Sequence, residues 1–297
     1  MYSVISKSRV HSLSIDCIME LFDRILLPIV TYGCEVWGFS NIDLLERFHL
    51  KFCKYILKIR RTSPNFMVYG ELGRYPISVD IKVRTIMYWA NLVQPKREKL
   101  PSKLYMLAVK FDLPWVKNVK KIFDDCGLSY IWNNQSFVNR NWLKSHVKMI
   151  LMDQYKQFWN GEVFNSPKGL NYRIFKNELE YERYLDVLST NDRILLTKFR
   201  TCNFKLPIET GRWQNIPRNQ RKCQICSKDE IGNEYHYLFN CNSDVISNAR
   251  MKYLPIFYTQ RPNTYKFTTL FNTKDEILLK KLCKFLSVIE KRVTTIL

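Results

Sequence analysis

The segment Cys223–Cys241 reads CQICSKDEIGNEYHYLFNC and decides how the C-terminal part of this chain of 297 residues folds. Its spacing is Cys-x2-Cys, nine residues, His, four residues, Cys, so the candidate metal ligands are Cys223, Cys226, His236 and Cys241. A Cys-x-x-Cys turn places two thiolates on one side of a tetrahedral ion, and the polar residues and glycine that follow let the chain reverse. Because protein side chains fill all four positions, the pattern predicts one structural Zn²⁺ rather than a catalytic metal.

Two other interpretations of these residues stay open. They are ordinary buried cysteines beside one hydrogen-bonded histidine, or they form a redox Cys-x-x-Cys motif. A redox motif normally opens a helix in a βαβ setting, and the sequence shows no such setting. Four ligand types in order at zinc-compatible spacing favour the metal, and basic side chains nearby should favour thiolates over thiols. These are Arg218, Arg221, Lys222 and Lys228.

Outward from this segment, apolar residues recur at the three-four spacing of helices along most of the chain. The first run begins near Ser14, a good N-cap residue, and the second begins near Asn41. Further helices are predicted over residues 79–93, 104–111, 115–126, 141–159, 190–202 and 278–293. With no convincing strand series in the sequence, the predicted fold class is mainly α: a helical, multi-lobe chain with a small C-terminal zinc-binding lobe of CCHC type.

Proline and glycine mark the breaks between these helices. Pro28 should kink or end the first helix, and Gly33 and Gly38 indicate a turn before the second. QPKREKLPS, residues 94–102, combines proline, charge and loss of apolar period, and NSPKG at 165–169 is a second break. The predicted regions are therefore 1–94, a helical connector over 103–189, and a zinc-binding region over 190–297.

The charge of the chain points to a polyanionic partner. Forty-seven Lys and Arg against 27 Asp and Glu give a formal net charge of +20. RNA or DNA is the leading candidate, with a merely basic protein and an anionic membrane surface as alternatives. Residues 47–61 hold six basic residues and no acid, and residues 193–222 hold eight basic residues against Glu209. Such segregation indicates surfaces that follow phosphates.

The candidate nucleic-acid-binding residues come from these two segments. They are Lys51, Lys54, Lys58, Arg60, Arg61, Lys198, Arg200, Lys205, Arg212, Trp213, Arg218, Arg221 and Lys222. Trp213, with Arg212 and Arg218 near it in sequence, is suited to stack on unpaired bases; the competing interpretation is a tryptophan that caps the zinc lobe.

Cysteine usage and hydropathy bear on the compartment. Nine cysteines, three of them in the metal pattern, and an N-terminus without signal-peptide order argue against a disulfide framework. The most apolar run, Ile25 to Cys34, is too short to span a bilayer. We expect a nuclear or cytoplasmic protein that is not secreted and has no membrane partner.

The sequence gives little support for catalysis. No P-loop, dinucleotide fingerprint, His-Glu-x-x-His or Gly-x-Ser-x-Gly motif is present. Asp124 and Asp125 form an acidic pair but lie at the tail of a predicted helix, where we expect them to be solvated. His49 and Cys53 are one helical turn apart, and core packing explains them better than a second metal site. We assign no catalytic residues.

Several motifs resemble a known family. LFDRILLPIVTYGCEVWG, LKFCKYILKIRRTSPNFMVYGELGRYP, KFRTCNFKLPIETGRW and the Cys-Cys-His-Cys segment together resemble the C-terminal third of LINE-type, non-LTR retrotransposon reverse transcriptases. The most specific parts are TYGCEVWG, residues 31–38, and VYGELGRYP, residues 68–76. The zinc segment looks like the reverse-transcriptase zinc-binding domain that ends many such proteins.

The resemblance carries expectations about function. The region 1–94 would correspond to the thumb, which grips the template-primer duplex, with Lys51 to Arg61 on or near that grip. The zinc end would bind RNA or target DNA within the rest of a retrotransposition complex. Fingers, palm and the aromatic-x-Asp-Asp motif should precede the region that matches Met1. The chain would then be a truncated copy, or one whose gene model begins at an internal methionine, and not an enzyme on its own.

Overall fold

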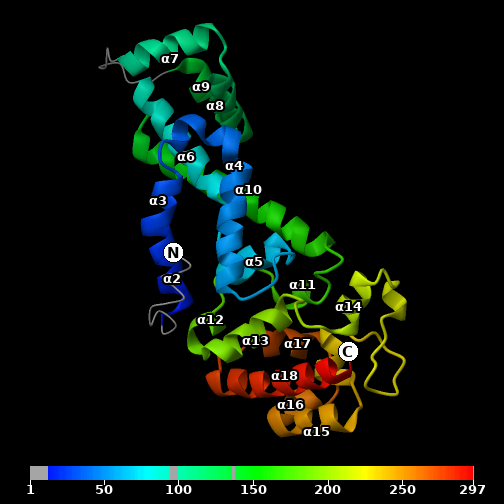
Figure 1. Ribbon diagram of the computed structural model, residues 1–297. Helices are drawn as coiled ribbons and strands as arrows, with labels where there is room; N and C mark the ends of the chain where they lie inside the picture. Colours follow the sequence, from blue (N-terminus) through cyan, green and yellow to red (C-terminus); the bar gives the residue numbers. More distant parts are fainter. Residues whose placement is uncertain (1–12, 94–99, 136–137, 297) are drawn as a thin grey trace. The chain divides into compact units, whose positions relative to one another are not determined.

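The computed structural model describes residues 13–93, 100–135 and 138–296, and it confirms the mainly α fold class. Across these residues there is no strand, only two isolated β-bridges, Leu72 with Tyr181 and Lys222 with Ile231. Figure 1 labels the elements. In order they are α2 (Ile15–Leu21), η2 (Phe22–Leu26), α3 (Leu27–Val30), α4 (Cys34–Ile56), α5 (Asn65–Leu72), α6 (Ile77–Leu92), α7 (Leu100–Lys110), α8 (Pro114–Asp125), α9 (Ser129–Asn134), α10 (Arg140–Asn165), α11 (Tyr172–Phe175), α12 (Tyr184–Val187), α13 (Thr190–Arg200), α14 (Pro207–Trp213), η3 (Arg218–Gln220), η4 (His236–Asn240), α15 (Asp244–Tyr253), α16 (Ile256–Thr259), α17 (Thr264–Phe271) and α18 (Glu276–Ile296). None of the helices in the described ranges is both long and apolar enough to cross a bilayer.

Contacts divide the chain into two compact units built from interleaved segments. The first contains residues up to 18, Lys51–Arg74 and everything from Trp159 on. The second contains Met19–Leu50 and Tyr75–Phe158. This division differs from the three consecutive regions expected from the sequence, because proline and charge mark local breaks but do not report which distant segments pack together. Residues 94–99 of the expected linker lie outside the described residues, and 100–102 already belong to α7.

The start of the chain bends where Pro28 requires it. Pro28 has no backbone N–H, and its ring crowds the carbonyl four residues earlier. The helix responds with a π-helical turn, η2, directly before α3, in whose first turn the proline lies. The expected kink is therefore present, as a change in hydrogen-bond register.

The predicted turn before the second helix is correct at Gly33 and wrong at Gly38. Gly33 adopts φ +68°, in the left-handed region, and α4 begins one residue later. Gly38 lies inside α4, which kinks at Asn41 (φ −130°). A Cβ on Gly38 would stand 2.8 Å from the Ile81 side chain, so this glycine permits close approach of α4 and α6.

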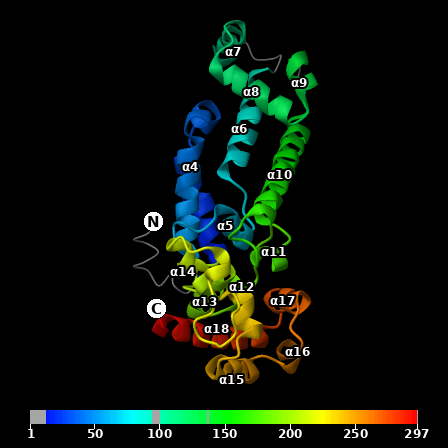
Figure 2. The same cartoon turned by 90° about the vertical axis from the view of Figure 1, so that its right-hand side faces the viewer.

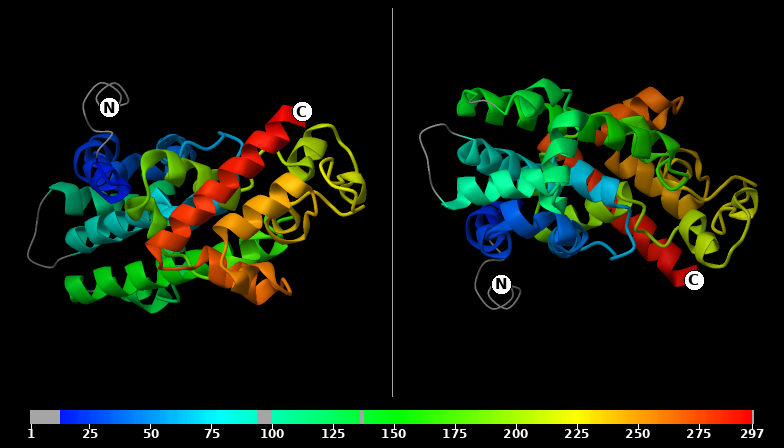
Figure 3. Two further views of the ribbon diagram at one scale, coloured as in Figure 1. Left: turned by 90° about the horizontal axis from the view of Figure 1, so that it is seen from below. Right: turned by 90° about the horizontal axis from the view of Figure 1, so that it is seen from above.

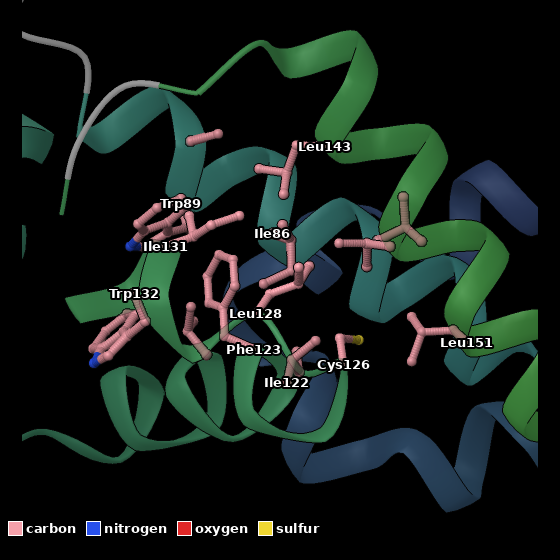
Figure 4. Packing of buried hydrophobic residues seen from close by; sticks show 14 of the residues in the cluster. Ile86, Trp89, Ile122, Phe123, Cys126, Leu128, Ile131, Trp132, Leu143 and Leu151 are labelled. Atoms are coloured by element: carbon pink, nitrogen blue, oxygen red, sulfur yellow. The ribbon is translucent and has the colours of Figure 1, made fainter. Parts of the chain in front are cut away.

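The second unit is held by an aromatic core. Trp89 of α6 packs edge-on to Phe123 of α8, with ring centroids 4.7 Å apart, and lies 6.2 Å from Trp132 of α9. Figure 4 shows these rings with Leu143 and Leu151 of α10, and Figure 2 shows the helices that surround them. Such edge-on aromatic pairs stabilise a core beyond the area they bury.

The first unit is built around α18. Helices α13 and α15 both pack against it, as Figure 3 shows. Leu282, Phe285, Leu286 and Ile289 of α18 are fully buried, at the spacing of one helical face. A second aromatic cluster joins α11 to α17, where the rings of Phe175 and Phe271 stack at 4.6 Å.

A buried ion pair lies inside this unit and corrects one expectation. The Arg200 guanidinium is inaccessible: Nε donates to Glu71 Oε2 at 2.8 Å, Nη2 lies 3.0 Å from Glu182, and Nη1 donates to the Phe271 carbonyl at 3.0 Å. The Tyr184 hydroxyl also donates to Glu71, at 2.6 Å. Burial alone would raise the pKa of Glu71, but Arg200 outweighs it and holds that pKa below its ordinary value. Arg200 is thus a core residue, not a nucleic-acid contact.

Glu71→Gln should destabilise the chain by about 3–5 kcal/mol, because it leaves the Arg200 charge buried without its partner. Denaturant unfolding followed by circular dichroism measures this. The matched control is Asp112→Asn, which breaks the exposed pair with Lys117 (N···O 3.1 Å) and should cost less than about 1 kcal/mol. Equal effects of the two substitutions would contradict the central place given to Arg200.

Candidate functional site

The four predicted ligands come together in the first unit. Cys223 and Cys226 lie in the irregular segment after η3, His236 opens η4, and Cys241 is its C-cap. Their ligand atoms all lie within 4.8 Å of one another. For Zn–S bonds of about 2.3 Å, tetrahedral geometry puts sulfur atoms about 3.8 Å apart, so small movements bring this group onto one ion.

The backbone explains why these ligands converge. The N–H of Cys223 donates to the Glu230 carbonyl at 2.9 Å, which turns the chain back beside the Lys222–Ile231 bridge. In η4 the Cys241 N–H donates to the His236 carbonyl at 2.8 Å, an i to i+5 bond. This π-type turn places two ligands five residues apart on the same side.

Arg250 of α15 secures the end of that turn. Its buried guanidinium donates to the carbonyls of Leu238 at 2.6 Å, Cys241 at 2.9 Å and Tyr237 at 3.3 Å. The last carbonyls of a helix have no partner within it, and a buried cation supplies one. Arg250 therefore holds the backbone that carries His236 and Cys241.

Hydrogen bonds prepare the Cys223 sulfur to act as a thiolate. The bond from the Cys241 thiol, helped by His236, Tyr237 and the Ile225 N–H, lowers the pKa of Cys223 to about 3 and outweighs burial. The larger contributions are thus not those of the nearby Arg and Lys side chains, to which the sequence had pointed. A thiolate is the form that a metal binds.

Glu230 is a functional residue that the sequence reasoning missed. Its Oε2 lies 2.9 Å from His236 Nδ1 and accepts a hydrogen bond from Asn240 at 3.1 Å. With the proton on Nδ1, the other nitrogen, Nε2, faces the cluster 3.4 Å from Cys226 Sγ. This carboxylate–histidine arrangement orients metal-binding imidazoles in general. The signal in the sequence was an acid six residues before the histidine, too common to interpret alone.

The residues present fit one structural metal ion. Three thiols and one imidazole are a donor set that Zn²⁺ prefers, and all but Cys226 are buried. Throughout the described ranges no other group of three or more Cys, His, Asp or Glu side chains is placed to bind an ion.

The two other features considered in the sequence have structural explanations. His49 and Cys53 are buried, and the His49 ring stacks on Phe22 at 5.5 Å. Asp124 and Asp125 are exposed at the end of α8, where Asp124 accepts a hydrogen bond from Ser129 at 2.6 Å. The expected packing and solvation are both confirmed.

The basic residues fall into three groups. Arg200 is buried in the ion pair described above. Lys54 is also buried, and its amine donates to the Arg61 carbonyl at 2.8 Å and to Asn65 at 2.9 Å, so it fastens a loop instead of reaching a ligand. Arg221 is half-buried and donates to the carbonyls of Ile216 and Ile208. The others keep exposed or half-buried side chains: Lys51, Lys58, Arg60, Arg61, Lys198, Lys205, Arg212, Arg218 and Lys222.

Within the first unit, two basic segments far apart in the sequence meet. The Arg60 N–H and the Ser63 hydroxyl donate to Asn203 Oδ1, at 3.3 and 2.8 Å, and Arg60 Nη2 donates to the Asn203 carbonyl at 3.1 Å. The Arg60 guanidinium also lies over the Trp213 ring, 4.3 Å from its centroid. Trp213 itself is 53% exposed, so it does not serve as a buried cap.

Comparison of the chain with protein-family models, with curated proteins and with solved structures found no match.

Cys226→Ser, or treatment with a strong chelator, should unfold the segment around η4, since metal-binding free energy is folding free energy here. Hydrogen exchange at the Cys241 amide should rise strongly, while amides of α6 in the other unit stay protected. Zinc content by elemental analysis should fall with the substitution; unchanged content and protection would contradict the ligand assignment.

Glu230→Ala should weaken zinc binding by about 10- to 100-fold, because His236 loses the carboxylate that fixes its ring. Competition with a chelator measures the affinity. Asp229→Ala is the control: its neighbouring carboxylate is 86% exposed and pairs with Lys222 instead. If the two variants bind zinc equally well, Glu230 does not support the metal.

Proposed function

We propose that this chain binds RNA or DNA through a basic surface of its first unit, and that a structural Zn²⁺ shapes the part of that surface that follows α14. The observation that carries this proposal is the meeting of two basic segments at Arg60, Asn203 and Trp213. Charges from both segments thereby reach one surface, as a phosphate backbone requires.

Two cavities on this unit support the proposal. One, of about 390 Å³, is lined by Lys51, Lys54, Tyr55, Ile59 and Arg61. The other, of about 270 Å³, is lined by four basic side chains against one acid, Glu290. A scattered charge distribution would have favoured a merely basic protein; a concentration of cations around hollows favours a polyanion.

The metal contributes through the loop that precedes it. Trp213 ends α14, and the chain then passes Arg218 and Lys222 before it reaches Cys223. Arg221 fixes this loop by its bonds to the Ile208 and Ile216 carbonyls. A bound ion would hold the far end of the same loop, so its role is to order the basic side chains.

We further propose that the chain is the C-terminal part of a LINE-type reverse transcriptase and does not polymerise DNA by itself. The support is the resemblance of residues 31–38, 68–76 and 223–241 to that family. The test is the genomic sequence directly upstream. An open frame encoding an aromatic-x-Asp-Asp motif is the expected result, and an unrelated upstream frame would remove the assignment.

A second candidate function is an α-helical scaffold for protein interactions. One observation favours it: α7 exposes Leu100, Leu104 and Leu107 along one face, with exposures of 69%, 55% and 50%. In a scaffold such a stripe would bind a partner helix, and the zinc would only stabilise the fold. Nucleic-acid binding that is insensitive to salt would favour this alternative.

For the nucleic-acid proposal, affinity should fall steeply with salt, because each phosphate contact releases counterions. The double variant Lys51→Glu/Arg61→Glu should weaken binding of a labelled RNA and flatten the salt dependence by about one logarithmic unit per lost contact. Fluorescence anisotropy across a salt series measures both quantities.

The control carries the same change of charge on the other unit. Lys120→Glu/Lys121→Glu alters exposed residues of α8 and should leave the salt slope almost unchanged. Equal losses in the two double variants would show that only net charge matters and would overturn the proposed surface.

A further inference from the structure

The smaller of the two basic cavities has features that specify the form of nucleic acid. Lys58, Arg60, Lys198 and Lys205 line it, together with Asn203, Phe204 and Glu290. Its volume of about 270 Å³ is at the lower limit of small-ligand pockets, which suits a phosphate group better than a large cofactor. Lys198 lies 4.0 Å from Glu290, so three cations exceed the local acid.

The backbone around this cavity is strained. Helix α4 ends in a turn in which the Ile59 N–H donates to the Lys54 carbonyl, with Lys58 at φ +54°. Helix α13 ends in the same way, with Asn203 donating to Lys198 and Cys202 at φ +55°. Glycine is the usual residue at such positions. Since Lys58 is exposed and strained, fold stability does not explain why a lysine stands there.

The ends of these two helices oppose an anion, because their carbonyls carry partial negative charge. Lysines at helix C-termini can therefore serve only to offset that charge. The number of cations exceeds this need, and one of them, Arg60, has a second contact. Its guanidinium is fixed on the Asn203 carbonyl and covers part of one face of the Trp213 ring.

Trp213 adds a contact that phosphates do not need. More than half of its surface is exposed, directly beside the cation that lines the cavity. An exposed indole next to a phosphate-binding group is the arrangement on which unpaired bases stack, and in a duplex the base faces are covered by neighbouring pairs. A duplex can use the cations of this cavity but not the ring.

We propose that this cavity and Trp213 form a subsite for single-stranded nucleic acid, with a backbone phosphate among Lys58, Arg60 and Lys205 and an unpaired base against the Trp213 ring. The proposal rests on the nucleic-acid binding proposed above and names its substrate class.

The experiment compares three labelled probes of equal length with the full zinc-loaded chain: a thymidine oligonucleotide, an abasic strand and a blunt duplex. The wild type should bind the thymidine strand more tightly than the abasic strand. Trp213→Ala should weaken the thymidine strand by about 5- to 100-fold and remove the preference over the abasic strand, with less than about twofold change on the duplex. Trp213→Phe should restore part of the affinity, which shows that the ring acts as a surface for stacking.

Two controls separate binding from folding. Trp142→Ala removes a tryptophan of similar exposure, 44%, from the other unit and should change none of the three affinities. Lys58→Gly suits a backbone with positive φ, so the melting temperature should not fall, while affinity for the thymidine and abasic strands should drop together.

The outcomes distinguish the two proposals. If the wild type binds no probe, or binds without salt dependence, nucleic-acid binding fails and this subsite fails with it. If salt-dependent binding is present but Trp213→Ala behaves like Trp142→Ala, or weakens the duplex equally, the single-strand subsite alone is overturned. Unchanged affinity of Lys58→Gly would mean that the lysine only offsets the helix end.

Discussion

The ion pair between Glu71 and Arg200 is the constraint on which the first unit depends. It joins α5, which precedes the second unit's long segment, to α13, which follows it, across 129 positions of sequence. Two charges removed from water must be fully paired and hydrogen-bonded, and here Tyr184, Glu182 and the Phe271 carbonyl complete the set. This requirement fixes the direction of α13, and the end of α13 in turn carries Asn203 to Arg60.

What the sequence could predict follows from the range of each interaction. Helix periodicity is local, so the long helices and the class of fold were accessible from the pattern of apolar residues. The metal ligands were accessible because all four lie within one short segment whose spacing reflects tetrahedral coordination. Arg200 and Lys54 were assigned to the surface because nothing near them in sequence shows their burial; only partners such as Glu71 do. Gly38 was interpreted as a turn residue for the same reason, since Ile81 is what requires the missing side chain.

The basic surface shows how position and charge differ as evidence. Thirteen residues were candidates from composition and resemblance, yet the structure gives them unequal access. Lys54, Arg200 and Arg221 fasten backbone carbonyls or carboxylates inside the fold, and this internal work accounts for part of the positive charge of both segments. The residues that remain accessible border cavities on the first unit. A net charge therefore overstates the cations that a partner can reach, and the geometry of each guanidinium decides its role.

The π-type turn of η4 has a consequence for how the metal motif can vary. In an α-helix two ligands share a face when three residues separate them, and the i to i+5 bond of η4 extends this to the four residues between His236 and Cys241. One inserted residue thus changes the type of turn but not the side on which the ligands lie. A spacing of His-x3-Cys on a regular helix and His-x4-Cys on a π turn would present the same pair of donors, so the length of this interval alone does not distinguish one metal site from another.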